Sequence, residues 1–185
     1  MRFYYCVQFS YPAVSDWTGL IPMEVERGET EAASLGQVEG EIVVTDPKAR
    51  NRKSFEFDSV FGPAATQDEI FEDTRQLVHS CCDGYNVCVF AYGQTGSGKT
   101  YTMEGTAENP GVNYRALGEL FKIRDERASE GTYTIQIALL EVYCEEIRDL
   151  LTSVKGPKKL EVKGAGSAMH VPGLTIQTVS SYEDV

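Results

Sequence analysis

The clearest periodic pattern in the chain predicts a helix that begins just after residue 66. Thr66 can cap the first turn, and Glu69 stands at the third position of a capping box. Mostly apolar side chains then recur at three- and four-residue spacing, which places them on one face of a helix. These residues are Ile70, Thr74, Leu77, Val78, Cys81 and Cys82. Because Asp83 and Gly84 end the pattern, we expect one helix with a single buried stripe.

Before this helix, apolar and β-branched runs predict a hairpin. The predicted strands of this hairpin are residues 41–45 and 54–57, and the turn begins at Asp46 and Pro47. Four basic residues lie in the connection: Lys48, Arg50, Arg52 and Lys53. They could contact an acidic partner, but we interpret them as a solvated hairpin tip, because charge runs at turns are common.

A continuous apolar run at residues 86–92 predicts a buried parallel strand. A glycine-rich loop follows, and then a short helix from about Lys99. Gly105 through Gly111 interrupts this helix, which resumes around Leu117 and continues to about Arg124. The order of elements is therefore strand, glycine loop and helix.

The last third of the chain predicts mixed elements. Residues 133–143 read as one long strand, residues 145–151 as a short amphipathic helix, and residues 160–163 as a further strand. Glu145 and Glu146 could be imagined as a metal or acid/base site. Adjacent helical residues point to different faces, so we interpret this pair as a solvated helix start. His79 and His170 are interpreted as exposed residues.

The loop itself matches the eight-position phosphate-binding pattern G-x-x-x-x-G-K-[ST] with nothing missing or inserted. It consists of Gly93, Gln94, Thr95, Gly96, Ser97, Gly98, Lys99 and Thr100. Its glycines let successive N–H groups point at phosphate oxygens. Lys99 is expected to reach the β and γ phosphates of a nucleoside triphosphate. Thr100 is expected to offer its hydroxyl to Mg²⁺, which prefers hard oxygen ligands.

Length, composition and net charge limit the possible number of domains, the partners and the cellular location. The chain has 185 residues, of which 42% are hydrophobic, and one α/β domain is the default for this length. Its net charge of −11 argues against nucleic acid or an anionic membrane as the main partner. The five cysteines have no metal-ligand spacing, and we interpret them as reduced thiols. The sequence shows no recognisable signal peptide or membrane helix. We therefore expect a cytoplasmic protein in which most of residues 13–41 are solvated or mobile.

Residues 83–103, which include the phosphate loop and the segments on both sides of it, resemble the kinesin motor domain. Four further blocks agree in order and spacing: residues 55–61, residues 111–117, residues 140–143 with 145–151, and residues 171–174. The resemblance covers about residues 37–185 and leaves residues 1–36 as a divergent, partly disordered segment. The sequence of residues 111–115 is most similar to that of plant kinesins with a C-terminal motor, which generally move toward microtubule minus ends.

The resemblance implies a phosphate-loop NTPase fold with three αβα layers. It also implies a motor that couples ATP binding and hydrolysis to movement along microtubules, with Mg²⁺ as the metal and the microtubule cytoskeleton as the location. Tyr101 falls at the position whose ring stacks on adenine. The loop residues, Gly93 to Thr100, match the family position by position.

Two departures from the family pattern shape these expectations. Residues 6–12 contain no arginine, whereas the family has an Arg-x-Arg-Pro pattern around the adenine. Neither of the family's two switch motifs is present, so ATPase turnover by this polypeptide alone is expected to be close to background. The strands that flank residues 86–92 in the family also come later than residue 185. Two alternatives stay open: a non-motile regulatory or interaction fragment, and an unrelated phosphate-loop enzyme such as a small-molecule kinase.

Overall fold

A computed structural model describes residues 33–38, 40–46, 51–62, 65–93, 95–153, 160–165 and 169–184. The predictions for residues 1–32, for Lys48 and Arg50 and for Gln94 lie outside these residues. The chain divides into two compact units, Met1–Ile123 and Arg124–Val185.

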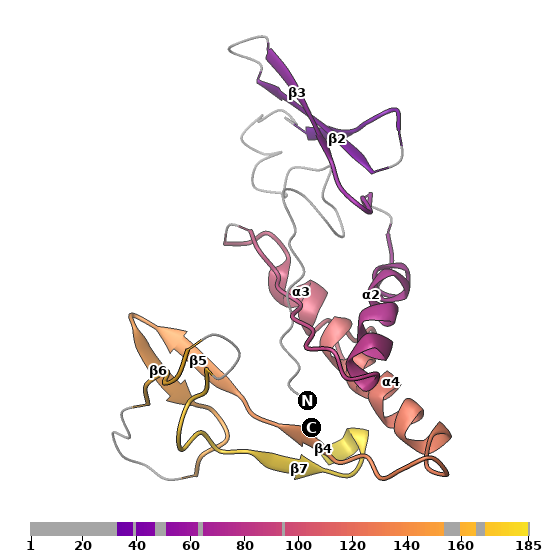
Figure 1. Ribbon diagram of the computed structural model, residues 1–185. Coiled ribbons are helices and arrows are strands. Elements are labelled where there is room, and N and C mark those ends of the chain that lie inside the picture. Colours follow the sequence, from indigo (N-terminus) through magenta and orange to yellow (C-terminus); the bar gives the residue numbers. More distant parts are fainter. Residues whose placement is uncertain are drawn as a thin grey trace. The chain divides into compact units, whose positions relative to one another are not determined.

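The first unit contains a three-stranded antiparallel sheet (Figure 1). It consists of β1 (Ala33–Leu35), β2 (Glu41–Asp46) and β3 (Asn51–Glu56), in the order β1-β2-β3. The predicted hairpin is confirmed as β2 and β3, which pair over their whole length. Arg52 and Lys53 belong to β3 rather than to the turn, because this strand begins three residues earlier than predicted. Strand β1 lies within residues 13–41, for which the composition predicts a mostly solvated or mobile segment.

Helix α2 (Gln67–Cys82) confirms the predicted cap. Glu69 N–H donates to Thr66 Oγ1 at 3.2 Å, and Thr66 N–H donates to Glu69 Oε2 at 2.7 Å. These reciprocal bonds satisfy backbone donors that have no partner inside the helix. Asp83 caps the other end, as its N–H donates to the carbonyl of His79 at 3.1 Å.

The buried face of α2 was predicted only in part. Ile70, Thr74, Val78 and Cys81 are buried as expected. Leu77 is exposed, and Phe71 takes a place in the core instead. The reason is tertiary, because the stripe that α4 (Val112–Glu126) covers is centred nearer to Phe71 than the sequence spacing indicates.

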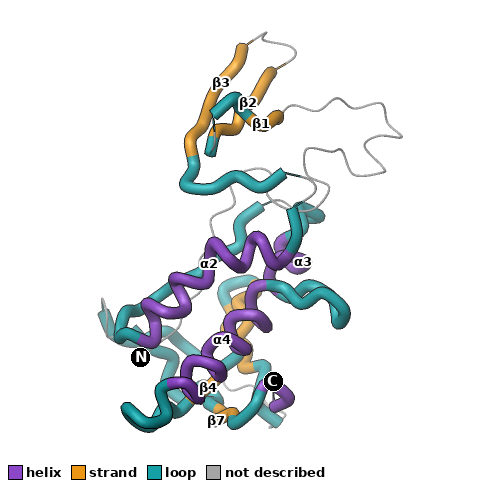
Figure 2. Tube along the Cα trace, turned by 90° about the vertical axis from the view of Figure 1, so that its right-hand side faces the viewer, coloured by secondary structure: helices purple, strands orange, loops and turns teal. Residues whose placement is uncertain are grey.

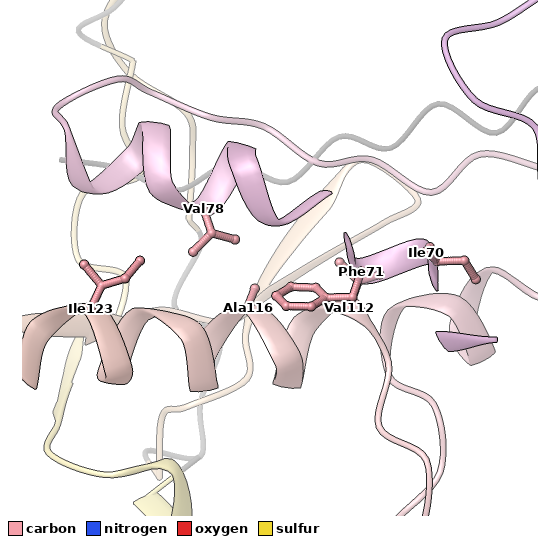
Figure 3. Packing of buried hydrophobic residues seen from close by; sticks show 6 residues of the cluster. All are labelled: Ile70, Phe71, Val78, Val112, Ala116 and Ile123. Carbon is pink, nitrogen blue, oxygen red and sulfur yellow. The ribbon is translucent and has the colours of Figure 1, made fainter. Parts of the chain in front are cut away.

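The packing of α2 against α4 forms the main hydrophobic core of this unit. Figure 2 shows the two helices running side by side, and Figure 3 shows side chains from both helices meeting between them. The buried members of the cluster are Ile70, Phe71, Val78, Val112, Ala116 and Ile123. A polar contact accompanies it, since His79 Nε2 lies 3.0 Å from Oε1 of the buried Glu119. The prediction of an exposed His79 is correct only in part, because the residue is half-buried and bonded to the neighbouring helix.

The prediction of a buried parallel strand at residues 86–92 is wrong. The structure assigns no strand there, and Val87 is the only bridged residue. Val87 and Val89 are buried against Cys81, with Met103 packed beside them, whereas Cys88 and Phe90 are exposed. This alternation is that of an extended segment with one covered face. A strand needs hydrogen-bonded neighbours on its edges, and an apolar run by itself does not supply them.

The interrupted helix is confirmed. Helix α3 (Lys99–Met103) has only five residues, and α4 begins at Val112. Between them, a tight loop is closed by an isolated bridge from Gly105 to Pro110. Gly111 N–H donates to the carbonyl of Glu104 at 2.8 Å, which joins the end of α3 to the start of α4.

The regular elements that the structure describes after α4 in the second unit are mainly short antiparallel strands. Strand β4 (Ile135–Ile137) pairs with β7 (Gln177–Val179), and β5 (Leu140–Tyr143) pairs with β6 (Glu146–Asp149). A 3-10 helix, η2 (Tyr182–Asp184), follows β7. The long strand predicted at residues 133–143 is thus two strands that belong to different sheets.

The helix predicted at residues 145–151 is also wrong. Its residues form β6, and Cys144 and Glu145 make the turn with φ of 49° and 65°. A two-residue hairpin turn of this kind needs positive φ at both central positions. The pairing of Val142 with Ile147 holds the segment in a hairpin, so Glu145 is a turn residue and not a helix start. The strand predicted at residues 160–163 is reduced to isolated bridges at Leu160 and Lys163, the latter to an exposed His170.

Candidate nucleotide-binding site

The phosphate-loop pattern adopts a tight turn that leads directly into α3. Gly96 and Gly98 have φ of 82° and 77°, in the left-handed region that favours glycine. Thr95 and Gly96 lie at the surface, while Ser97, Gly98 and Lys99 are half-buried. The loop is therefore bent as the motif requires, with its tip open to solvent.

Lys99 closes the loop on itself. Its Nζ donates to the carbonyl of Gly93 at 2.9 Å, which joins the last part of the motif to its first residue. Lys99 is also the only charged residue between positions 93 and 101. The positive charge is thus held at the loop, where phosphate oxygens would compete with the carbonyl for its hydrogen bonds.

Ser97 lies over the start of the loop. Its Oγ is buried and forms no hydrogen bond within the described part of the chain. A side chain at position 93 would collide with this oxygen, so Gly93 allows the close approach. A buried hydroxyl without a partner is unusual in proteins and is often found at functional sites.

The two threonines of α3 have different environments. Thr100 is exposed, so its hydroxyl is accessible to an ion from solvent. Thr102 is 1% exposed and donates its hydroxyl to the carbonyl of Gly98 at 3.1 Å. Thr102 therefore supports the loop from inside, a role that the sequence motif does not contain.

Two more residues that support this site come from other elements and were missed by the sequence. Gln67 of α2 donates from Nε2 to the carbonyl of Tyr101 at 2.7 Å. Arg115 of α4 donates to Asp68, to Asn109 Oδ1 at 3.0 Å and to the carbonyl of Pro110 at 2.7 Å. The bonds from Gln67 to Tyr101 and from Arg115 to Asp68 join positions 34 and 47 residues apart, and no local pattern signals these two bonds.

The described residues were also compared with the requirements of a metal site, a membrane-spanning helix and a disulfide. Among the described residues, no group of three His, Cys, Asp or Glu side chains is arranged to hold a metal ion, and Glu145 and Glu146 form no such site. No helix in the described ranges is long and apolar enough to cross a membrane. In the part of the chain that the structure describes, Cys81, Cys82, Cys88 and Cys144 form no disulfide, and burial raises the pKa of the Cys81 thiol.

Comparison with known proteins identifies the family. The family model of the kinesin motor domain matches residues 21–185 of this chain. The kinesin-like protein KIN-14E of Oryza sativa subsp. japonica is 50% identical over 151 residues, which cover 81% of this chain and 14% of that protein. The kinesin-like protein KIN-14Q of Arabidopsis thaliana is 50% identical over 168 residues, which cover 85% of this chain and 14% of that protein. This chain belongs to the kinesin motor domain family.

A solved structure shows the same fold. The KIF14 dimer in its two-heads-bound state, with AMP-PNP in complex with a microtubule, superposes with a TM-score of 0.79 at 31% identity. The match covers 97% of this chain and 52% of that chain. The α/β kinesin motor fold expected from the resemblance is therefore confirmed, as is the similarity to plant KIN-14 kinesins. The chain spans about a seventh of the length of these two plant relatives and about half of the KIF14 chain.

Proposed function

We propose that this chain is the nucleotide-binding portion of a microtubule motor and that its loop binds the triphosphate of ATP with Mg²⁺. The observation that carries the proposal is the intact phosphate loop, closed by the bond from Lys99 Nζ to the carbonyl of Gly93. The family membership supports the same function, because kinesins are motors that use ATP.

Each loop residue has a proposed role. The backbone N–H groups of residues 93–100 surround the phosphates, and Lys99 exchanges its bond to Gly93 for bonds to the β and γ phosphates. Thr100 supplies its exposed hydroxyl to Mg²⁺, whose remaining ligands are phosphate oxygens and water. The half-buried ring of Tyr101 stacks on the adenine.

The proposed partner is the microtubule, and the proposed location is the microtubule cytoskeleton. The support is the KIF14 structure, which was solved in complex with a microtubule. Microtubule-based movement is then the function of the motor to which this chain contributes its nucleotide site. The net charge of −11 remains our reason for expecting neither nucleic acid nor a membrane as the main partner.

Calorimetry with Mg·ATP tests the nucleotide site directly. Lys99→Ala removes the only charged side chain of the loop, so we expect a loss of affinity of about tenfold or more. Lys53→Ala is the matched control, because Lys53 lies exposed on β3, and its affinity should equal that of the unchanged chain. No heat of association with the folded chain, or an unchanged affinity after Lys99→Ala, would refute the proposal.

Co-sedimentation with microtubules tests the partner. Binding that changes when ATP is added supports a motor. If the chain binds ATP but never sediments with microtubules, the non-motile fragment becomes the better interpretation.

A further inference from the structure

We propose that Gln67 is a positioning residue of the nucleotide site and that it sets where α3 presents the Tyr101 ring to the base. The inference rests on the proposed function, since it concerns the same nucleotide. Gln67 lies in α2, and its Nε2 donates to the carbonyl oxygen of Tyr101 at 2.7 Å. The contact joins the start of α2 to the helix that follows the phosphate loop.

The bond supplies a donor that α3 lacks. The last carbonyls of a helix have no N–H partner inside it, and in a five-residue helix this affects almost every carbonyl. The Thr100 carbonyl accepts from Glu104 N–H at 2.7 Å. The next carbonyl, that of Tyr101, accepts from Gln67 instead. The position of the Tyr101 backbone therefore depends on a side chain from another helix.

The orientation of the Gln67 amide is determined by this contact. A carbonyl oxygen only accepts, so the NH₂ group must face Tyr101 and the amide oxygen must point away. Gln67 is 1% exposed, and its Oε1 accepts no hydrogen bond from the residues that the structure describes. Burying an amide with one end unbonded is unfavourable. An apolar residue would fill this place more favourably unless the bond to Tyr101 is needed.

Gln67 is itself held on both sides. The preceding residue, Thr66, is the cap of α2. The following residue, Asp68, is paired with Arg115, which also donates to Asn109 and Pro110 in the loop after α3. The amide donor of Gln67 therefore lies in the capped first turn of α2. This turn is bonded through Asp68 and Arg115 to the loop that follows α3.

The phosphate part of the site does not depend on Gln67 in the same way. Lys99 is bonded to Gly93, and Thr102 is bonded to Gly98, so both are tied to the loop itself. Loss of the Gln67 bond is thus expected to loosen α3 at Tyr101, its middle residue, while the loop keeps its shape. The effect should fall on recognition of the base more than on recognition of the phosphates.

The test compares two ligands on the full chain. Gln67→Met keeps the volume of the side chain but removes its donor, and we expect the dissociation constant of Mg·ATP to rise about tenfold. The dissociation constant of Mg·tripolyphosphate, measured by displacement of a fluorescent nucleotide, should change by less than about twofold, since a factor of two is a small free-energy difference. Gln76→Met is the matched control, because Gln76 lies exposed on the same helix. It should change neither value.

The outcomes separate this inference from the proposed function. If the unchanged chain does not bind Mg·ATP, the proposed function fails and takes the inference with it. If the unchanged chain binds but Gln67→Met binds Mg·ATP equally well, or loses both ligands equally, only the inference is overturned. Should Gln67→Met unfold, Gln67→Asn repeats the comparison with an amide whose reach is one methylene shorter, and the same results decide.

Discussion

The α2–α4 pair and the hairpin β5–β6 have similarly apolar sequences but very different burial. In the helix pair, Ile70 and Val112 are 1% and 0% exposed. In the hairpin, Val142 and Tyr143 are 65% and 59% exposed. The helices bury a continuous stripe against each other, whereas all four residues of β5 are exposed.

An apolar pattern therefore indicates which side chains would gain stability from burial, but not whether another element is present to bury them. Each helix of the pair supplies the other with a complementary face. Ile147 is half-buried, and its backbone bridges to Leu160, one of the few buried residues in the described part of the second unit. We therefore expect the stability of the chain to depend mainly on the helix pair.

The largest expected effect comes from truncating matched isoleucines in the two units. Ile70→Ala opens a cavity between α2 and α4 and should lower the free energy of unfolding by about 2–5 kcal/mol. Ile176→Ala removes the same atoms from a side chain that is 62% exposed, so a loss below about 0.5 kcal/mol is expected. Urea denaturation followed by circular dichroism measures both. Equal losses would mean that the two units contribute alike.

A smaller effect of the opposite sign is expected at the hairpin turn. Glu145 has φ of 65°, which is unfavourable for a residue with a Cβ atom. Glu145→Gly should therefore stabilise the hairpin by about 1 kcal/mol. The control is Glu146→Gly, since Glu146 is a strand residue of β6, where glycine destabilises. Hydrogen exchange of the β5 and β6 amides measures both, and protection that changes in the same direction in both variants would contradict the turn assigned here.

The smallest effect concerns acid stability in the second unit. A side-chain hydrogen bond with Thr175, together with backbone donors, lowers the pKa of Asp149 below its ordinary value. Thr175 N–H donates to Oδ2 at 2.8 Å, and Leu151 N–H donates to Oδ1 at 3.0 Å. Because the pKa is lower in the folded state, the carboxylate stabilises the fold above its unfolded pKa. This stabilisation is lost as the pH falls through the folded pKa.

Asp149→Asn should therefore flatten the decline of stability below pH about 4, where an unfolded aspartate begins to bind a proton. Thr175→Ala provides a graded comparison, because it removes the largest contribution and leaves the backbone donors. Unfolding measured between pH 5 and 2 gives both curves. An unaltered acid decline in Asp149→Asn would show that this carboxylate does not contribute.

Much of the fold could be predicted because its signals are local. Helix α2 followed from its capping box and periodicity, and the break between α3 and α4 followed from Gly105 and Pro110. The segments at residues 86–92 and 145–151 were misassigned because their structure depends on neighbours. An apolar run suits a strand only where partners pair with it, and residues 146–149 became a strand because residues 140–143 lie opposite.

The candidate site divides in the same way. The phosphate loop was recognisable since its function requires particular residues at consecutive positions, and the structure gives Gly96 and Gly98 the expected left-handed backbone. Gln67 and Arg115 were not recognisable. Gln67 bonds Tyr101 and Arg115 bonds Asp68, 34 and 47 positions away, and hydrogen bonding at that separation leaves no periodic trace in the chain.

The phosphate loop, the capped helix before it and the kinesin family could be identified from residue types at short, defined spacing. That Phe71 rather than Leu77 enters the core, and that Gln67 bonds the Tyr101 carbonyl, depends on how the helices pack in three dimensions. Burial and long-range hydrogen bonds are properties of two surfaces. A one-dimensional pattern specifies only one of them.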